Sequence, residues 1–163
     1  MRHKIALAAA TVALLIAASA CQNNGHIGQL FGTWALEAYT VDGEAVDSLT
    51  VPYQSARVPI HNVTLSFQGS VCEFVTVLDD YHNYIESYGT WSEAPGSITL
   101  DFTHTDSDRP EPGGYTYAPP AWLGMTFQEP MQMDKVDGPD RNMTLSWIDP
   151  QGVVRVYKFH KTW

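Results

Sequence analysis

The stretch LFGTWALEAYTVDGE, residues 30–44, decides the fold of this chain. Alternate residues from Trp34 to Ala38 share one face of a strand, and Asp42-Gly43 forms the turn that ends it. The stretch therefore predicts the first strand of a β domain, which is either a barrel built to hold a small molecule or an ordinary packed domain.

The same alternation of apolar and polar residues continues along the chain. In the first strand it places Tyr39 on the face opposite Trp34. Further strands are predicted at 62–68, 71–78, 81–92, 98–103, 122–136, 143–148 and 153–160. Residues 104–120, with four prolines, have no such alternation and are interpreted as a mobile loop or lid at the barrel rim. The predicted fold is all-β: a single up-and-down antiparallel barrel of eight to nine strands, with a sandwich as the alternative.

The N-terminus has the features of an export signal. A basic start is followed by an apolar run, residues 5–18, which is too short to be a stable membrane span. The small residues before Cys21 resemble the lipobox of bacterial lipoproteins, in which the cysteine is acylated and becomes the first residue. The alternative is cleavage by the general signal peptidase after Ala18-Ser19-Ala20. We expect a signal peptide at 1–20, a lipidated cysteine and tether at 21–30, and a barrel domain at 31–163.

The chain has two cysteines, Cys21 and Cys72. If Cys21 carries a thioether lipid, Cys72 is a lone thiol and should be buried within the apolar run 71–78. If the general peptidase removes the signal, a Cys21–Cys72 disulfide can form instead. The mass of the mature chain distinguishes the two.

The formal net charge of −9 argues against nucleic acid and against anionic lipid as partners of the domain itself. The acidic residues are scattered, which is typical of a solubilising surface. Gln22 follows the cysteine where an inner-membrane retention signal would have Asp, and no acidic run follows. We therefore expect a monomer anchored to the membrane through Cys21, on the periplasmic face of the outer membrane.

Motifs for catalysis are absent from the sequence. The histidines are dispersed, and no H-E-x-x-H, G-x-S-x-G or paired-cysteine spacing occurs. We expect no enzymatic activity, no cofactor and no metal site. Asp47-Ser48-Leu49 resembles an acceptor sequence for periplasmic O-glycosylation, so Ser48 is a candidate for a sugar.

Several short motifs together carry a family resemblance. Gly32-Thr33-Trp34, GTWS at 89–92, ITLDF at 98–102 and the C-terminal MTLSWIDPQGVVRVYKFHKTW resemble the lipid-anchored, lipocalin-like domains of Gram-negative gut bacteria. The resemblance implies a barrel for a small-molecule or lipid-like ligand. It also implies that Gly32 and Trp34 form the floor of the barrel, where the glycine lets the chain pass close beneath the barrel end and the indole closes it. Such barrels place a basic side chain over the tryptophan, for which Arg155 is the first candidate and Lys161 the second.

The resemblance leads to two function hypotheses. In the first, the barrel binds a small hydrophobic or amphipathic molecule, and Glu86 could hold a cationic head group. In the second, a filled barrel is a protein- or glycan-interaction module, because the same side chains can equally form packed core. The candidate lining residues are Tyr84, Glu86, Tyr88, Trp91, Phe102, Trp122, Met125, Phe127 and Trp147.

Overall fold

The computed structural model describes residues 28–53, 56–79, 83–103, 114–116, 118–126 and 128–163. The chain divides into two compact units, residues 1–31 and 32–163. In the described part of the first unit, the Phe31 N–H donates to the Gly28 carbonyl at 3.1 Å. The expected export signal and Cys21 lie outside the described residues.

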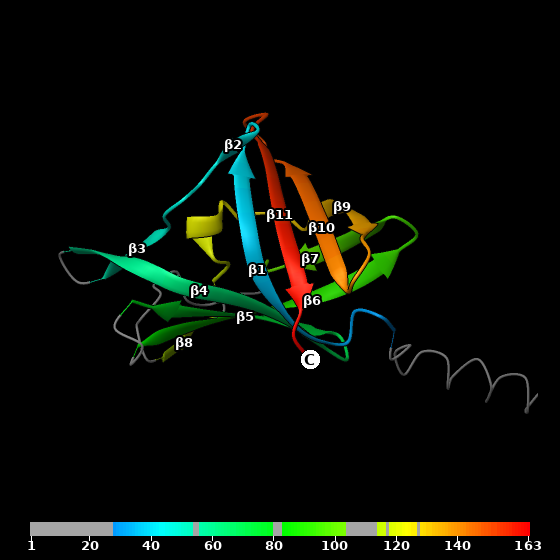
Figure 1. Cartoon of the computed structure of the whole chain (residues 1–163), viewed down its shortest axis with the longest axis horizontal. Helices are drawn as coiled ribbons and strands as arrows, with labels where there is room; N and C mark the ends of the chain where they lie inside the picture. Colours follow the sequence, from blue (N-terminus) through cyan, green and yellow to red (C-terminus); the bar gives the residue numbers. More distant parts are fainter. Residues whose placement is uncertain (1–27, 54–55, 80–82, 104–113, 117, 127) are drawn as a thin grey trace, which may run out of the picture. The chain divides into compact units, whose positions relative to one another are not determined.

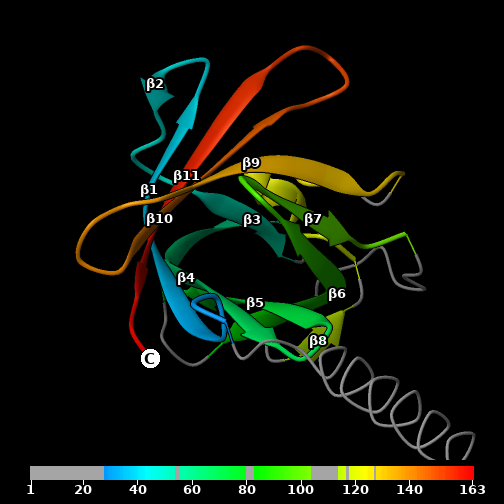
Figure 2. The same cartoon turned by 90° about the vertical axis from the view of Figure 1, so that its right-hand side faces the viewer.

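Within the described residues, the second unit is a closed barrel of eight antiparallel strands (Figures 1 and 2). Each barrel strand pairs with the next one along the chain, and β1 pairs with both β11 and β4, which closes the ring. The prediction of an up-and-down eight-stranded barrel is therefore confirmed. The strands are β1 (Gly32–Val41), β4 (Ala56–Gln68), β5 (Val71–Leu78), β6 (Tyr84–Ala94), β7 (Ser97–Asp101), β9 (Met131–Asp137), β10 (Asn142–Ile148) and β11 (Val154–Lys161).

Short elements extend this ring. β2 (Glu44–Ala45) pairs with β1, β3 (Thr50–Tyr53) pairs with β4, and β8 (Gly114–Thr116) pairs with β6 in parallel. A 3₁₀ helix, η1, spans Ala121–Leu123. Two predictions are corrected here: the strand expected at 122–136 begins only at Met131, and β8 lies within the stretch expected to be a loop. Among the described residues, no helix has the length and apolar character needed to cross a membrane.

The core follows the period-two pattern in most strands. Leu65, Phe74, Ile98 and Leu145 point inward from four different strands and are fully buried, as the alternation predicts. Cys72 is buried, as expected for that residue, while Cys21, the partner in the alternative disulfide, lies outside the described residues. Burial raises the pKa of the Cys72 thiol to about 12, so the group is inert near neutral pH.

Two β-bulges interrupt this regular pattern. The pairing of β1 with β11 shifts between Leu36 and Ala38, so Glu37 is the extra residue. The pairing of β4 with β5 shifts between Ile60 and Asn62, so His61 is the extra residue. The first bulge reverses the side-chain alternation: Tyr39 is buried and Ala38 is exposed, opposite to the prediction.

Candidate functional site

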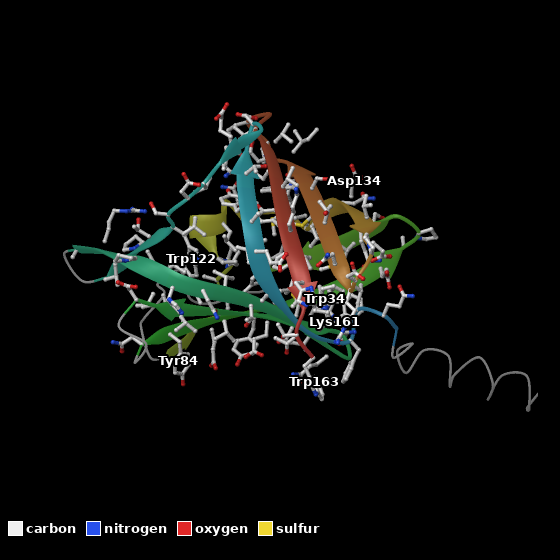
Figure 3. All side chains as sticks on the ribbon, in the orientation of Figure 1. Trp34, Tyr84, Trp122, Asp134, Lys161 and Trp163 are labelled. Carbon is white, nitrogen blue, oxygen red and sulfur yellow. The ribbon has the colours of Figure 1, made fainter. Side chains whose placement is uncertain are left out.

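Trp34 lies at one end of the barrel, which we call the Trp34 end. The indole is 3% exposed, and Lys161 Nζ lies 5.3 Å from its ring centroid (Figure 3). The Thr33 N–H donates to the Trp163 carbonyl at 3.1 Å, which ties the C-terminus to the start of β1. Gly32 has φ 119°, and a Cβ there would clash with that same carbonyl oxygen. The close approach of the two backbones therefore requires glycine.

Arg155 lies at the opposite end, so its expected position over Trp34 is wrong. β11 runs antiparallel to β1 and pairs Arg155 with Val41, whereas Lys161 pairs with Trp34. The Arg155 guanidinium instead donates to the Tyr39 hydroxyl at 2.6 Å and to Asp149 Oδ2 at 3.0 Å. The second candidate, Lys161, is the cation that covers the indole.

Residues 118–125, which we call the cap, occupy this opposite end. The Leu123 carbonyl accepts hydrogen bonds from the hydroxyls of Tyr39, at 3.1 Å, and Tyr157, at 2.7 Å. The two phenol rings stack with centroids 5.1 Å apart. Gly124 adopts a left-handed conformation, with φ 77°, where a Cβ would collide with the Arg155 guanidinium. In Figure 1, η1 (yellow) lies between β1 and the β4–β5 layer.

Asp149 is the anion that holds Arg155 in place. Burial alone would raise its pKa, but the Val153 N–H, the Arg155 guanidinium and the Gln151 N–H all donate to this carboxylate, and the net effect lowers its pKa. Burial also raises the pKa of the Tyr157 phenol, which keeps its hydroxyl protonated as the donor to the cap. The cap is thus fixed by a connected set of polar contacts.

Three of the predicted lining residues face away from the barrel interior. Tyr84, Glu86 and Tyr88 lie on the outer face of β6, and the inward positions are Ile85, Ser87 and Gly89. Figure 3 shows Tyr84 on the outside of the barrel. The inward position at Gly89 must be small, because a Cβ there would lie 2.8 Å from the Phe102 ring. Aromatic content therefore predicted the wrong face of this strand.

The other predicted lining residues are distributed through the core. Trp91 packs edge-on against Phe67, with ring centroids 4.9 Å apart. Trp122 and Met125 belong to the cap, and Trp122 packs on a cluster of Val51, Leu78 and Ile85. Phe102, Met125 and Trp147 are buried. Phe127 lies outside the described residues.

A cleft that the sequence did not predict lies where β1 and β4 separate. The two strands pair only between Gly32–Ala35 and Thr64–Phe67, and beyond that point they diverge (Figure 1). Residues 46–49 bridge the gap, with the Val46 N–H bound to the Tyr39 carbonyl and the Ile60 N–H bound to the Leu49 carbonyl, each at 2.9 Å. The cleft between them, which we call the window, has a volume of about 230 Å³ and is lined by residues 36–39, 46–49 and 59–63.

The two bulged residues line opposite sides of the window. Glu37 comes from the bulge in β1 and His61 from the bulge in β4. Bulges re-aim side chains and increase strand twist, which accounts for both the separation of the strands and the polar edge. Leu36 and Val63 supply apolar surface, and Asp47 adds a second carboxylate. Period-two reasoning missed this site because it assumes that no strand has an extra residue.

Ser48 is exposed at the edge of this window. Among the residues the structure describes, no three His, Cys, Asp or Glu side chains are grouped so that they could hold a metal ion.

No family model matches the chain, and the search of curated proteins gives no match. Among solved structures, the chain is similar to the crystal structure of an uncharacterized protein from Bacteroides eggerthii. The two are 16% identical, the match covers 81% of this chain and 98% of that one, and the TM-score is 0.49.

Proposed function

We propose that the protein is a non-catalytic binding protein, with a lipocalin-like barrel that takes a small amphipathic molecule at the window. The observation that carries this proposal is the cleft of about 230 Å³ between β1 and β4. Trp34 occupies one end of the barrel and the cap occupies the other. The window is therefore an opening through which a ligand can reach apolar side chains.

The lining of the window favours a ligand with a cationic group. Glu37 and Asp47 contribute carboxylates, and the lining contains no Lys or Arg. Leu36, Val63 and Ile60 offer apolar contacts for a short hydrocarbon portion. The cleft is smaller than the roughly 300–1,000 Å³ typical of sites for drug-sized ligands. A short alkylamine therefore has the matching size, charge and polarity.

Calorimetric titration with octylamine, and with octanoate as the matched anion, tests this proposal. Ala38 is an exposed residue of the window, so Ala38→Trp fills the cleft without altering the core, and Ala94→Trp on the exposed end of β6 is the control. We expect octylamine to bind the wild type and Ala94→Trp, with at least about tenfold weaker binding to Ala38→Trp, a loss of about 1.4 kcal/mol. Equal binding to all three proteins would contradict the proposal.

We also propose that the barrel is held at a membrane through a lipid on Cys21, on the periplasmic face of the outer membrane. This part rests on the small residues before Cys21. Multiple acyl chains give lasting attachment, whereas a single chain does not. The mass of the mature protein from its own cells should equal that of the chain from Cys21 plus lipid, and an unmodified Cys21 would exclude the anchor.

A second candidate function, binding of a protein or glycan, is favoured by the outer face of β5 and β6. Val71 and Tyr84 lie at opposite ends of this face and are 42% and 41% exposed, and half-buried Val75, Val77 and Tyr88 also face outward there. Apolar groups gathered on a surface are typical of interaction sites. This function predicts that Tyr84→Ala abolishes partner capture while Ala38→Trp leaves it unchanged.

A further inference from the structure

Four buried side-chain polar atoms have no hydrogen-bond partner among the described residues. They are Thr76 Oγ1, Ser87 Oγ, Trp91 Nε1 and Trp122 Nε1. Buried polar groups in proteins are nearly always hydrogen-bonded, to protein or to ordered water. The polar groups of Tyr39 and Tyr157 at the cap follow that rule. An unpaired buried group therefore indicates that something else supplies the missing partner.

Three of the four atoms belong to residues on or next to one part of the barrel wall. Thr76 on β5 pairs directly with Ile85 on β6, and Ser87 is the next inward residue on β6; both are 0% exposed. Trp122 of the cap, labelled in Figure 3, packs on the cluster of Val51, Leu78 and Ile85. The fourth atom belongs to Trp91, which packs on Phe67 and lies toward the other end of β6.

The chemistry of these three groups selects their partner. An indole N–H can only donate, whereas the Thr and Ser hydroxyls can donate or accept. The oxygen of a water or an alcohol can satisfy all three, because it accepts from the indole N–H and one hydroxyl and donates to the other hydroxyl. At this end of the barrel, Arg155 and Asp149 form an ion pair and neutralise each other's charge. The pair leaves no net charge to stabilise a buried ion, so the oxygen should be uncharged.

We propose that Thr76, Ser87 and Trp122 form a buried site, beneath the cap, for an uncharged acceptor oxygen. The oxygen belongs either to an ordered water molecule or to a hydroxyl group of a small molecule retained in the barrel. The residues of this site are separate from those of the window, so the proposal does not rest on the proposed function.

Thermal unfolding of hydroxyl-deletion variants tests the site. Thr76→Val and Ser87→Ala remove one hydroxyl each with little change in volume, and Thr90→Val on the outer face of β6 is the control. If the oxygen is bound, both inward variants should lower Tm by about 3 °C or more, while the control leaves Tm unchanged or raised. If the hydroxyls lie in a dry core, their removal is neutral or raises Tm, and the proposal fails.

Refolding distinguishes the two sources of the oxygen. The wild type and Thr76→Val are unfolded in guanidinium, dialysed and refolded. A water returns on refolding, so the Tm difference between the two proteins should persist. A retained small molecule is lost, so the wild-type Tm should fall and the difference should disappear. A high-resolution crystal structure with no oxygen within hydrogen-bond distance of Thr76 and Ser87 would overturn both versions.

Discussion

The two ends of the barrel are closed in different ways. At the Trp34 end, one indole, one lysine and the C-terminal backbone meet the start of β1. At the other end, the cap is held by Tyr39 and Tyr157, which lie 84 and 34 residues from Leu123 in sequence. Both closures join residues far apart in sequence, but the first uses backbone contact and one cation over an indole, whereas the second uses side-chain hydrogen bonds to a backbone carbonyl. Different substitutions should therefore destabilise the two ends.

The largest effect is expected at Gly32. In Gly32→Ala, the new Cβ meets backbone atoms of Trp163 that cannot rotate away, at a φ of 119°. We expect the free energy of unfolding to fall by about 3 kcal/mol or more in urea titrations. Gly96→Ala is the matched control, because Gly96 also has positive φ but nothing within 4 Å of its Cβ position. A loss of about 1 kcal/mol is expected there. Equal losses would show that the two backbones do not approach closely at the Trp34 end.

The next effect is expected at the cap. Arg155→Met removes the hydrogen bonds that the guanidinium donates to Tyr39 and Asp149. We expect a loss of about 2 kcal/mol from the hydrogen bonds of this charged group, and faster hydrogen exchange in residues 118–125. Lys158→Met, an exposed position on the same strand, is the control and should change neither quantity. Faster hydrogen exchange around Trp34 instead would contradict the position of Arg155 at the cap end of the barrel.

The cap end should also depend on pH. Because the pKa of Asp149 is lowered on folding, its contribution to stability is complete above an unfolded-state pKa of about 4 and is lost as the pH falls through the lower folded-state value. Acid titration followed by exchange at residues 118–125 measures this loss. Asp149→Asn should flatten the dependence. An unchanged pH profile in that variant would assign the acid sensitivity to another group.

The smallest effect is expected at Lys161. Its ammonium group lies 5.3 Å from the Trp34 centroid, and partly exposed cation–π pairs contribute about 0.5–1 kcal/mol. Lys161→Met should therefore destabilise the protein less than Arg155→Met and should shift the tryptophan fluorescence. A larger loss of stability in Lys161→Met than in Arg155→Met would contradict the expectation that the cap end contributes more to stability than the cation at the Trp34 end.

Most of the fold could be predicted from period-two alternation. β4 after its bulge, β5, β7 and β10 each bury the residues that the pattern selects, such as Phe67, Phe74, Leu100 and Leu145. β6 was misjudged because its outer face is rich in aromatic residues, whereas its inner face has Ser87 and Gly89 to make room for Phe102. Large side chains therefore do not identify the inward face of a strand when a residue from elsewhere, here Phe102, fills the space in front of that face.

The window and the cap could not be predicted because both depend on long-range geometry. A single extra residue at Glu37 or His61 exchanges the inward and outward positions that follow it in the strand. The alternation of apolar and polar residues does not show where such a residue lies. Arg155 was expected over Trp34 but lies at the other end, because the register of β11 against β1 decides its position. Leu123 is fixed through its carbonyl, a group that every residue has.

The central claim is that small molecules reach the barrel through the window and not through its ends. Backbone NMR of the full folded domain, titrated with octylamine, tests it most directly. The account predicts that the shifted amides cluster in residues 36–39, 46–49 and 59–63, while those of residues 118–125 stay in place. Shifts concentrated in the cap and around Arg155, with the window unaffected, would contradict it.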